Sequence, residues 1–202
     1  MMRRLAALAA TGALAWAGQA SAAELMLGAY AHNFDQYVQD RHSGFERGAD
    51  IQFGVRSDRI EPLRLIGAPQ AHAFISVNTE GVTNFAAVGL SWPIRLNHRF
   101  YVRPGLGIAY GDGKTELPPS NVPGLSPEEI QRRLQLRHDR IGFGSRWLFE
   151  PELNFGAHIT DRWSAELSWV HLSNGEILHQ GRNQGLDDVG VRVIYALGAR
   201  GR

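Results

Sequence analysis

Hydrophobic and polar residues alternate along most of the chain after residue 23, in segments of about ten residues separated by polar turns or by turns with proline and glycine. Alternation with a period of two is typical of β-strands that have one apolar face. In the clearest segment, Phe100, Val102 and Leu106 share one face, while Tyr101 and Arg103 share the other. The pattern predicts eight strands, at about residues 24–33, 50–56, 71–78, 83–92, 100–110, 140–158, 163–173 and 189–197.

The face opposite the apolar one distinguishes between two kinds of barrel. It includes Arg56, Arg103, Glu166 and Arg192, which are too many charges for the apolar ligand cavity of a soluble lipocalin-like barrel. We therefore predict an all-β fold, an eight-stranded antiparallel transmembrane β-barrel of the outer membrane whose apolar face meets lipid. A lipocalin-like barrel or a periplasmic sandwich is the alternative. Aromatic residues near strand ends, where the two girdles of such a barrel lie, are Trp92, Phe100, Trp147, Trp163, Trp169 and Tyr195.

The first 22 residues have the pattern of a secretory signal peptide. Arg3 and Arg4 precede an apolar run from Leu5 to Trp16, and Ala20-Ser21-Ala22 offers small residues for cleavage. This run is too short to span a membrane, and no later run reaches 18 apolar residues. We expect cleavage near Ala22, and the remaining residues 23–202 suit a single domain.

Charge and cysteine content narrow the classes of function. Removal of residues 1–22 takes away two arginines and no acidic residue, so the formal net charge falls from +1 to about −1. Such a chain has no strong field for nucleic acid, which we exclude as a partner. The chain has no cysteine, so an exported form must close its fold without disulfides, as a closed barrel does.

The longest connection, residues 111–138, contains a helix start at Ser126-Pro127-Glu128-Glu129. Serine is a good N-cap, proline suits the first turn, and the acidic residues favour the positive end of the helix dipole. We predict a solvated surface helix here; a lid or substrate clamp is the alternative.

The candidate chemistry lies at the end of the seventh segment. Because strand side chains alternate, His171 and Ser173 point the same way, about 7 Å apart along the backbone. The same face holds Leu167 and Trp169, so the pair lies on the apolar side of its strand. A hydrolase needs such a pair when an imidazole must take the proton of a hydroxyl nucleophile, and Asp187 follows as a candidate acid.

The segments His171-Leu172-Ser173-Asn174 and Asn183-Gln184-Gly185-Leu186-Asp187 resemble the signature of the lipid A 3-O-deacylase (PagL) family. The resemblance extends upstream to Leu148–Leu153 and Trp163-Ser164, and covers about residues 145–197. It implies an eight-stranded outer-membrane barrel with a hydrolytic triad. Because the termini of such barrels lie in the periplasm, the seventh strand runs outward and its pair meets the outer leaflet, where lipid A is found.

The resemblance also implies residue roles. Ser173 attacks the ester carbonyl, His171 takes its proton, and the acid holds the imidazole in the required tautomer. The acid that aligns with the family motif is Asp187, where a well-characterised form of the family has glutamate and a shorter spacer. Asp188 is the neighbouring alternative; counting back from Val189 favours Asp187 if the strand continues regularly that far.

The oxyanion and orienting groups stay open among Asn174, Gly175 and Asn183. No cluster of histidines and carboxylates has metal-ligand spacing, and the mechanism requires neither a metal nor another cofactor. His158 and His179 lack catalytic companions and are interpreted as structural.

We therefore expect an outer-membrane esterase that removes the 3-hydroxyacyl chain at the 3-position of lipid A by a Ser-His-Asp mechanism. Its partners would be lipopolysaccharide and the membrane, and the sequence permits a homodimer. Two alternatives are a phospholipase or acyltransferase barrel and a non-catalytic structural or adhesin barrel.

Overall fold

The computed structural model describes residues 22–34 and 44–198. The predicted signal peptide lies almost entirely outside the described residues. The first described strand begins at Ala22, and no helix among the described residues is long and apolar enough to span a membrane.

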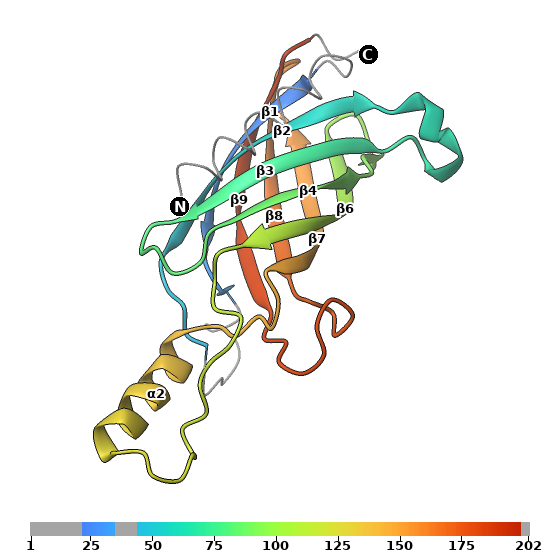
Figure 1. Cartoon of the computed structure of the whole chain (residues 1–202). Helices are drawn as coiled ribbons and strands as arrows, with labels where there is room; N and C mark the ends of the chain where they lie inside the picture. Colours follow the sequence, from blue (N-terminus) through green and yellow to red (C-terminus); the bar gives the residue numbers. More distant parts are fainter. Residues whose placement is uncertain (1–21, 35–43, 199–202) are drawn as a thin grey trace.

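The described strands form one antiparallel sheet that closes on itself, which confirms the predicted barrel (Figure 1). The sheet runs in the order β4-β3-β2-β1-β9-β8-β7-β6-β5, and pairing of β4 with β6 completes the circle. The short β5 lies within one turn and leaves eight strands that span the barrel. The strands are β1 (Ala22–Ala31), β2 (Ala49–Arg59), β3 (Gln70–Asn78), β4 (Phe85–Ser91), β5 (Ile94–Arg95), β6 (Phe100–Gly111), β7 (Trp147–His158), β8 (Trp163–Leu172) and β9 (Leu186–Ala196).

The barrel has two unlike ends. At the turn end, where β1 begins and β9 ends, the connections are short; one contains a 3₁₀ helix, η2 (Glu61–Ile66). At the loop end, where β8 ends and β9 begins, residues 112–146 and 173–185 form long connections. The candidate residues of β8 therefore lie at the loop end.

The interior holds the charged residues that the alternation predicted, and it also holds a buried apolar cluster that includes Phe74, Leu148 and Leu172. Arg56, Arg103 and Arg192 are at most 3 % exposed and are paired with buried glutamates. Arg56 Nη1 lies 2.9 Å from Glu24 Oε2, and Arg192 Nη1 lies 2.8 Å from Glu152 Oε2. Paired charges are the form in which ions are tolerated in an interior. In the described part of the chain, an ion network thus occupies much of the lumen, beside the buried apolar cluster.

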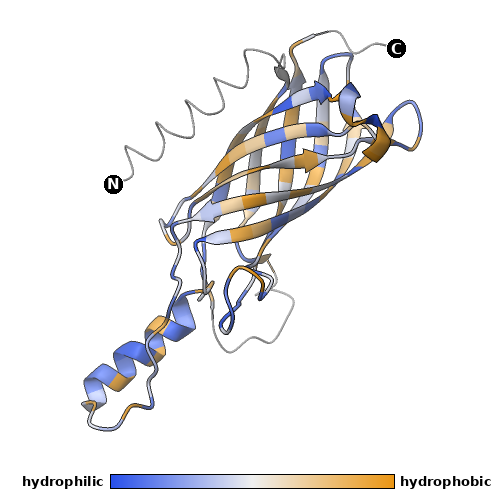
Figure 2. Ribbon diagram, turned by 45° about the vertical axis from the view of Figure 1, so that its right-hand side comes forward, coloured by the Kyte–Doolittle hydropathy of each residue, from blue (hydrophilic) through white to orange (hydrophobic). Residues whose placement is uncertain are grey.

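The outer face of the barrel is apolar, as the sequence pattern predicted. Figure 2 shows hydrophobic residues alternating with polar ones along the strands. Leu27, Phe53 and Leu167 are at least half exposed on the outer face. Aromatic residues lie at both ends, as expected: Trp163 contacts Tyr195 at the turn end, and Trp147 contacts Tyr110 at the loop end.

Several strand boundaries differ from the prediction, among them the end of β2 at Arg59 and the three that follow. The sixth spanning strand begins at Trp147 and not at residue 140, because Gly144 has a φ of 75° and Phe143 bonds to Lys114 instead of continuing the ladder. The first strand ends at Ala31, before Asn33 with its φ of 53°. The last strand begins at Leu186, three residues earlier than predicted.

Helix α2 (Pro127–Asp139) confirms the predicted surface helix. Ser126 caps it by accepting a hydrogen bond from Glu129 N. Hydrogen bonds from Arg132 and Arg133 lower the pKa of Glu129 to about 2. None of its residues is buried, and the helix projects from the loop end of the barrel (Figure 1).

Candidate active site

The register of β8 against β9 places His171 directly opposite Asp187. Their side chains meet on the outer face, where His171 Nδ1 lies 2.9 Å from Asp187 Oδ1. The two side chains are 26 % and 18 % exposed, so the contact is partly shielded from water yet open to a ligand. Because Asp187 accepts a hydrogen bond from Nδ1–H, it favours the tautomer whose Nε2 can act as a base.

Trp169 supports the same carboxylate from two positions earlier on β8. Its Nε1–H donates to Asp187 Oδ1 over 2.8 Å, and its ring stacks on His171 with centroids 5.9 Å apart. One carboxylate oxygen thus accepts two hydrogen bonds, and the imidazole packs against an indole. These contacts fix the orientation of His171.

Ser173 follows β8 on the same outer face, two residues beyond His171. Its backbone forms two hydrogen bonds with Phe149 of β7, which hold the serine in strand geometry. No hydrogen bond within the described part of the chain uses the Ser173 hydroxyl. Catalytic hydrogen bonds are often long or unformed before substrate binds, and here the hydroxyl is left available to react.

Gly185, just before β9, lies against the edge of the His171 ring formed by Cε1 and Nε2. A Cβ atom built on Gly185 would lie 2.6 Å from His171 Cε1 and 3.3 Å from His171 Nε2. The first distance is shorter than packed atoms approach each other, and the second is tighter than most such contacts. Glycine at this position is therefore a packing requirement of His171.

Asn174 and Asn183 tie the ends of the 173–185 loop together. Asn174 N–H donates to Asn183 Oδ1 over 2.9 Å, and the buried Asn174 amide donates to Phe143 O and Arg182 O. The Asn174 side-chain oxygen accepts from Glu176 N. The N–H groups of Asn174 are thus all engaged in holding the loop, which leaves this residue an orienting function.

Two of the predicted donors remain uncommitted among the described residues. Gly175 N–H and Asn183 Nδ2 have no acceptor there, and Gly175 has a φ of 63°, which suits glycine. Gly175 also contacts the Phe149 ring closely enough that an added Cβ would lie 3.0 Å from it. Gly175 follows Ser173 by two residues, and Asn183 bonds to Asn174, the residue after Ser173.

The two neighbouring aspartates of β9 point to opposite faces. Asp187 faces outward to His171, whereas Asp188 is 1 % exposed inside the barrel, near His32 and Asp50. The regular strand from Leu186 thus places Asp187, and not Asp188, beside the imidazole. His158, which bonds to Ser164 and contacts Tyr101, lies at the turn end, far from this site.

Positive charge borders the site on the loop side. Arg182 belongs to the 173–185 loop, and burial together with the charge of Arg137 lowers its pKa. Arg137 belongs to α2 and bonds to Leu117 O. The two guanidinium groups lie close enough to affect each other, so this part of the loop end carries positive charge.

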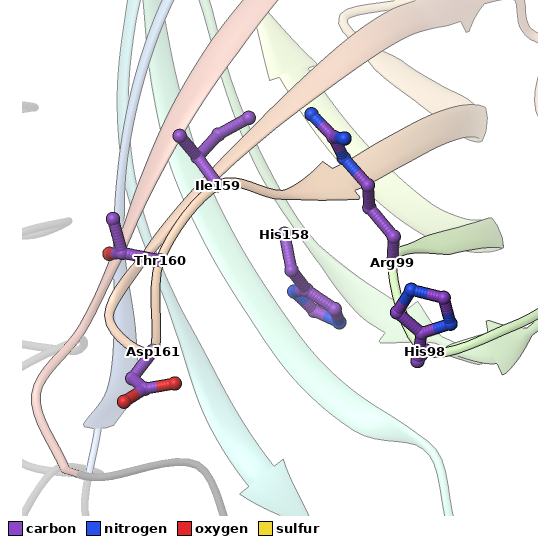
Figure 3. Close-up of a pocket in the computed structure, with 6 residues that line it drawn as sticks. All are labelled: His98, Arg99, His158, Ile159, Thr160 and Asp161. Carbon is purple, nitrogen blue, oxygen red and sulfur yellow. The ribbon is translucent and has the colours of Figure 1, made fainter.

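An open pocket at the other end of the barrel contains none of the predicted site residues (Figure 3). It has a volume of about 400 Å³ and is lined by His98, Arg99, His158, Ile159, Thr160 and Asp161. The β5–β6 and β7–β8 turns form it, so it is separated from His171 by the length of β8.

Comparison with known proteins identifies a family and a similar fold. A family model described as lipid A 3-O-deacylase (PagL) matches residues 66–196. The crystal structure of the outer membrane enzyme PagL is similar with a TM-score of 0.56 and 14 % identity, over 87 % of this chain and 100 % of that one. A de novo designed transmembrane β-barrel gives a TM-score of 0.47 and 10 % identity, over 87 % and 96 % of the two chains. No curated protein sequence matches significantly.

Proposed function

This chain belongs to the lipid A 3-O-deacylase (PagL) family, and we propose that it removes the ester-linked 3-hydroxyacyl chain at the 3-position of lipid A, with Ser173 as nucleophile. The family is one of ester hydrolases, and the fold is that of an outer-membrane barrel. The finer claims, on the triad and on the position of the ester, are inferences from the geometry of the site and from the family.

The observation that supports the proposal most directly is the 2.9 Å contact between His171 and Asp187 on the outer face. A structural barrel has no need for an imidazole–carboxylate pair on its apolar side, where polar groups are costly. Ser173 shares that face with a free hydroxyl. Together the three residues could supply the nucleophile, the general base and the orienting acid of a serine esterase.

The reaction then follows from the contacts. Ser173 Oγ attacks the ester carbonyl and transfers its proton to His171 Nε2, while Asp187 holds Nδ1–H and stabilises the imidazolium. The tetrahedral intermediate collapses and the C–O bond to the sugar breaks. The sugar oxygen takes the proton from His171 and leaves as a hydroxyl. Water, activated by the same imidazole, releases the 3-hydroxy fatty acid from Ser173.

Gly175 N–H and Asn183 Nδ2 are the donors that we assign to the oxyanion. Both are uncommitted among the described residues, Gly175 lies two residues after Ser173, and Asn183 is held by Asn174, the residue after Ser173. Donors fixed before the reaction stabilise the developing charge without reorganisation, which is a large term in catalysis.

The surroundings suit an amphipathic, phosphorylated lipid. Trp169, Leu167 and Leu153 expose apolar surface beside the triad, which matches acyl chains. The guanidinium groups of Arg182 and Arg137 border its loop side, which matches the phosphates of lipid A. The site therefore lies where the membrane changes from acyl chains to head groups.

The first test is mass spectrometry of lipid A. Purified barrel in detergent is mixed with hexa-acylated lipid A that bears a 3-hydroxyacyl chain at position 3. We expect loss of that chain and the appearance of one equivalent of free 3-hydroxy fatty acid. Unchanged lipid A with a folded barrel, or turnover of phospholipid in its place, would contradict the proposal.

Substitution of Gly185 by alanine is expected to lower kcat by about 100-fold, because the new methyl group would push the imidazole by roughly an ångström. The barrel should still fold, since Gly185 lies outside the strands. Deacylation rates in detergent measure the effect. Gly198→Ala is the control, because a Cβ atom there meets nothing within 4 Å. Equal rates for the two variants would show that Gly185 does not position His171.

A further inference from the structure

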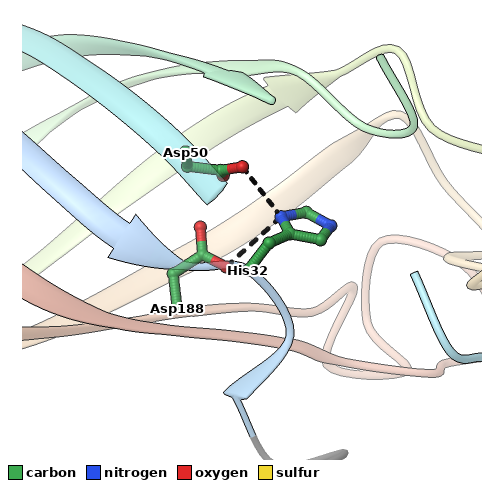
Figure 4. A group of neighbouring side chains, drawn as sticks. All are labelled: His32, Asp50 and Asp188. Atoms are coloured by element: carbon green, nitrogen blue, oxygen red, sulfur yellow. Dashed lines mark ion pairs between the residues drawn. The ribbon is translucent and has the colours of Figure 1, made fainter. Parts of the chain in front are cut away.

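Three buried side chains converge inside the barrel at the loop end, on the inner side of the strand that bears Asp187 (Figure 4). His32 follows β1, Asp50 belongs to β2 and Asp188 belongs to β9. All three are at most 1 % exposed. None takes part in the proposed reaction, so their burial calls for another explanation.

We propose that His32, Asp50 and Asp188 bind one divalent transition-metal ion. His32 Nδ1 lies 3.1 Å from an oxygen of Asp50 and 3.5 Å from an oxygen of Asp188. One ligand atom from each residue falls within 4.8 Å of the others. Ligands bound at about 2.0–2.2 Å in a tetrahedral site lie about 3.4 Å apart, so these separations fit one shared ion.

Glu46 contacts the second ring nitrogen of His32, as carboxylates commonly do beside metal-binding histidines. Its carboxylate lies 3.3 Å from His32 Nε2, on the ring nitrogen opposite the cluster. Histidine ligands commonly donate their second ring N–H to a carboxylate, which orients the ring and raises its basicity. Thr83 and Arg140 hold Glu46 in turn, at 2.6 and 2.8 Å.

Unsatisfied acceptors point to a cation. Asp188 Oδ2 and Asn33 Oδ1 are buried and have no hydrogen-bond donor among the described residues. The two residues are neighbours, since Asn33 N donates to Asp188 Oδ1 over 3.2 Å. Buried acceptors without partners are rare and costly, and a bound ion would satisfy them.

Charge balance favours the same conclusion. A divalent ion neutralises the carboxylates of Asp50 and Asp188, with His32 neutral as a ligand must be. Arg140 neutralises Glu46. The buried group then carries no net charge.

The kinds of ligand atom indicate the class of metal. One imidazole nitrogen with two carboxylates suits Zn²⁺ and similar transition metals, whereas Ca²⁺ and Mg²⁺ prefer oxygen ligands alone. The bound ion would join β2, β1 and β9, which are neighbours across the closure of the barrel. It would thus fix the loop end of β9 one residue from Asp187.

Sequence spacing gives no signal for this site, because 18 residues separate His32 from Asp50 and 138 separate Asp50 from Asp188. Closure of the barrel brings them together. The statement that no cluster has metal-ligand spacing concerns the sequence alone, and it does not extend to residues that only the closed sheet brings together.

The test is metal binding by the full barrel, refolded in detergent with Zn²⁺ or Co²⁺, since a buried site is filled during folding. We expect one equivalent of Zn²⁺ per chain after desalting, and Co²⁺ absorption bands of a four- or five-coordinate nitrogen–oxygen site. The Asp188→Asn variant should lose at least tenfold in affinity, and Glu46→Gln should lose about 10- to 100-fold.

His138→Asn is the matched control, because His138 is an exposed histidine beside an aspartate, Asp139, and its loss should leave binding unchanged. If Asp188→Asn fails to fold, the Co²⁺ spectrum and stoichiometry of the unaltered barrel still decide. Folded barrel without bound metal would overturn the proposal, as would equal binding by Asp188→Asn or a preference for Ca²⁺ or Mg²⁺.

Discussion

Replacement of Ser173 by alanine is expected to reduce deacylation of lipid A by on the order of 10⁶-fold, to below detection by mass spectrometry. Removal of the nucleophile of a serine hydrolase has about this cost, because donors and binding alone give only weak catalysis. The backbone hydrogen bonds between residue 173 and Phe149 do not involve the hydroxyl, so the variant should fold and reach the membrane normally.

Ser168→Ala is the matched control. Ser168 lies on the same strand but is buried on the inner face, so its hydroxyl cannot reach a lipid outside the barrel. The heat-dependent mobility shift of barrels in electrophoresis verifies folding of both variants. Deacylation at the normal rate by Ser173→Ala would place the nucleophile elsewhere, and loss of activity in Ser168→Ala alone would place it in the lumen.

Asp187→Asn is expected to lower kcat by about 10⁴-fold with little change in the binding of lipid. An amide of the same shape can donate to Nδ1 and so favours the tautomer in which Nε2 already carries a proton. It also loses the charge that stabilises the imidazolium. Single-turnover rates with purified lipid A in detergent measure the effect.

The Asp187→Glu variant keeps the negative charge of residue 187 but lengthens its side chain, so it tests the two properties separately. It keeps the carboxylate and should retain more activity than Asp187→Asn. Asp161→Asn, an exposed aspartate at the turn end, should leave the rate unchanged. A loss of less than tenfold in Asp187→Asn would show that the acid does not orient His171 during the reaction.

The alternation of apolar and polar residues was sufficient to predict the barrel architecture. In a barrel that faces lipid, charged residues are costly on the outer face, so the pattern predicts the lumen for them. It does not do so for apolar residues, since Val170 and Leu172 are buried on the inner face. Arg56, Arg103, Glu166 and Arg192 were assigned to the lumen in this way, and all four are buried there. The boundaries at Trp147 and Leu186 were not predictable, because a glycine with positive φ and long-range pairing decided them.

For the candidate site too, the sequence predicted one part and the tertiary structure decided the other. Parity alone placed His171 and Ser173 on one outer face, because both belong to one strand and its continuation. The sequence left Asp187 and Asp188 as alternatives, and only the register of β8 against β9 put Asp187 within 2.9 Å of the imidazole.

The sequence by itself thus determined the barrel, the charged residues of its lumen and the pair on its apolar face, since these depend on local alternation. The closed sheet decided what depends on contacts between distant segments. These are the engagement of Asn174, the clearance that Gly185 gives His171, and the convergence of His32, Asp50 and Asp188, whose separations in sequence have no periodic signature.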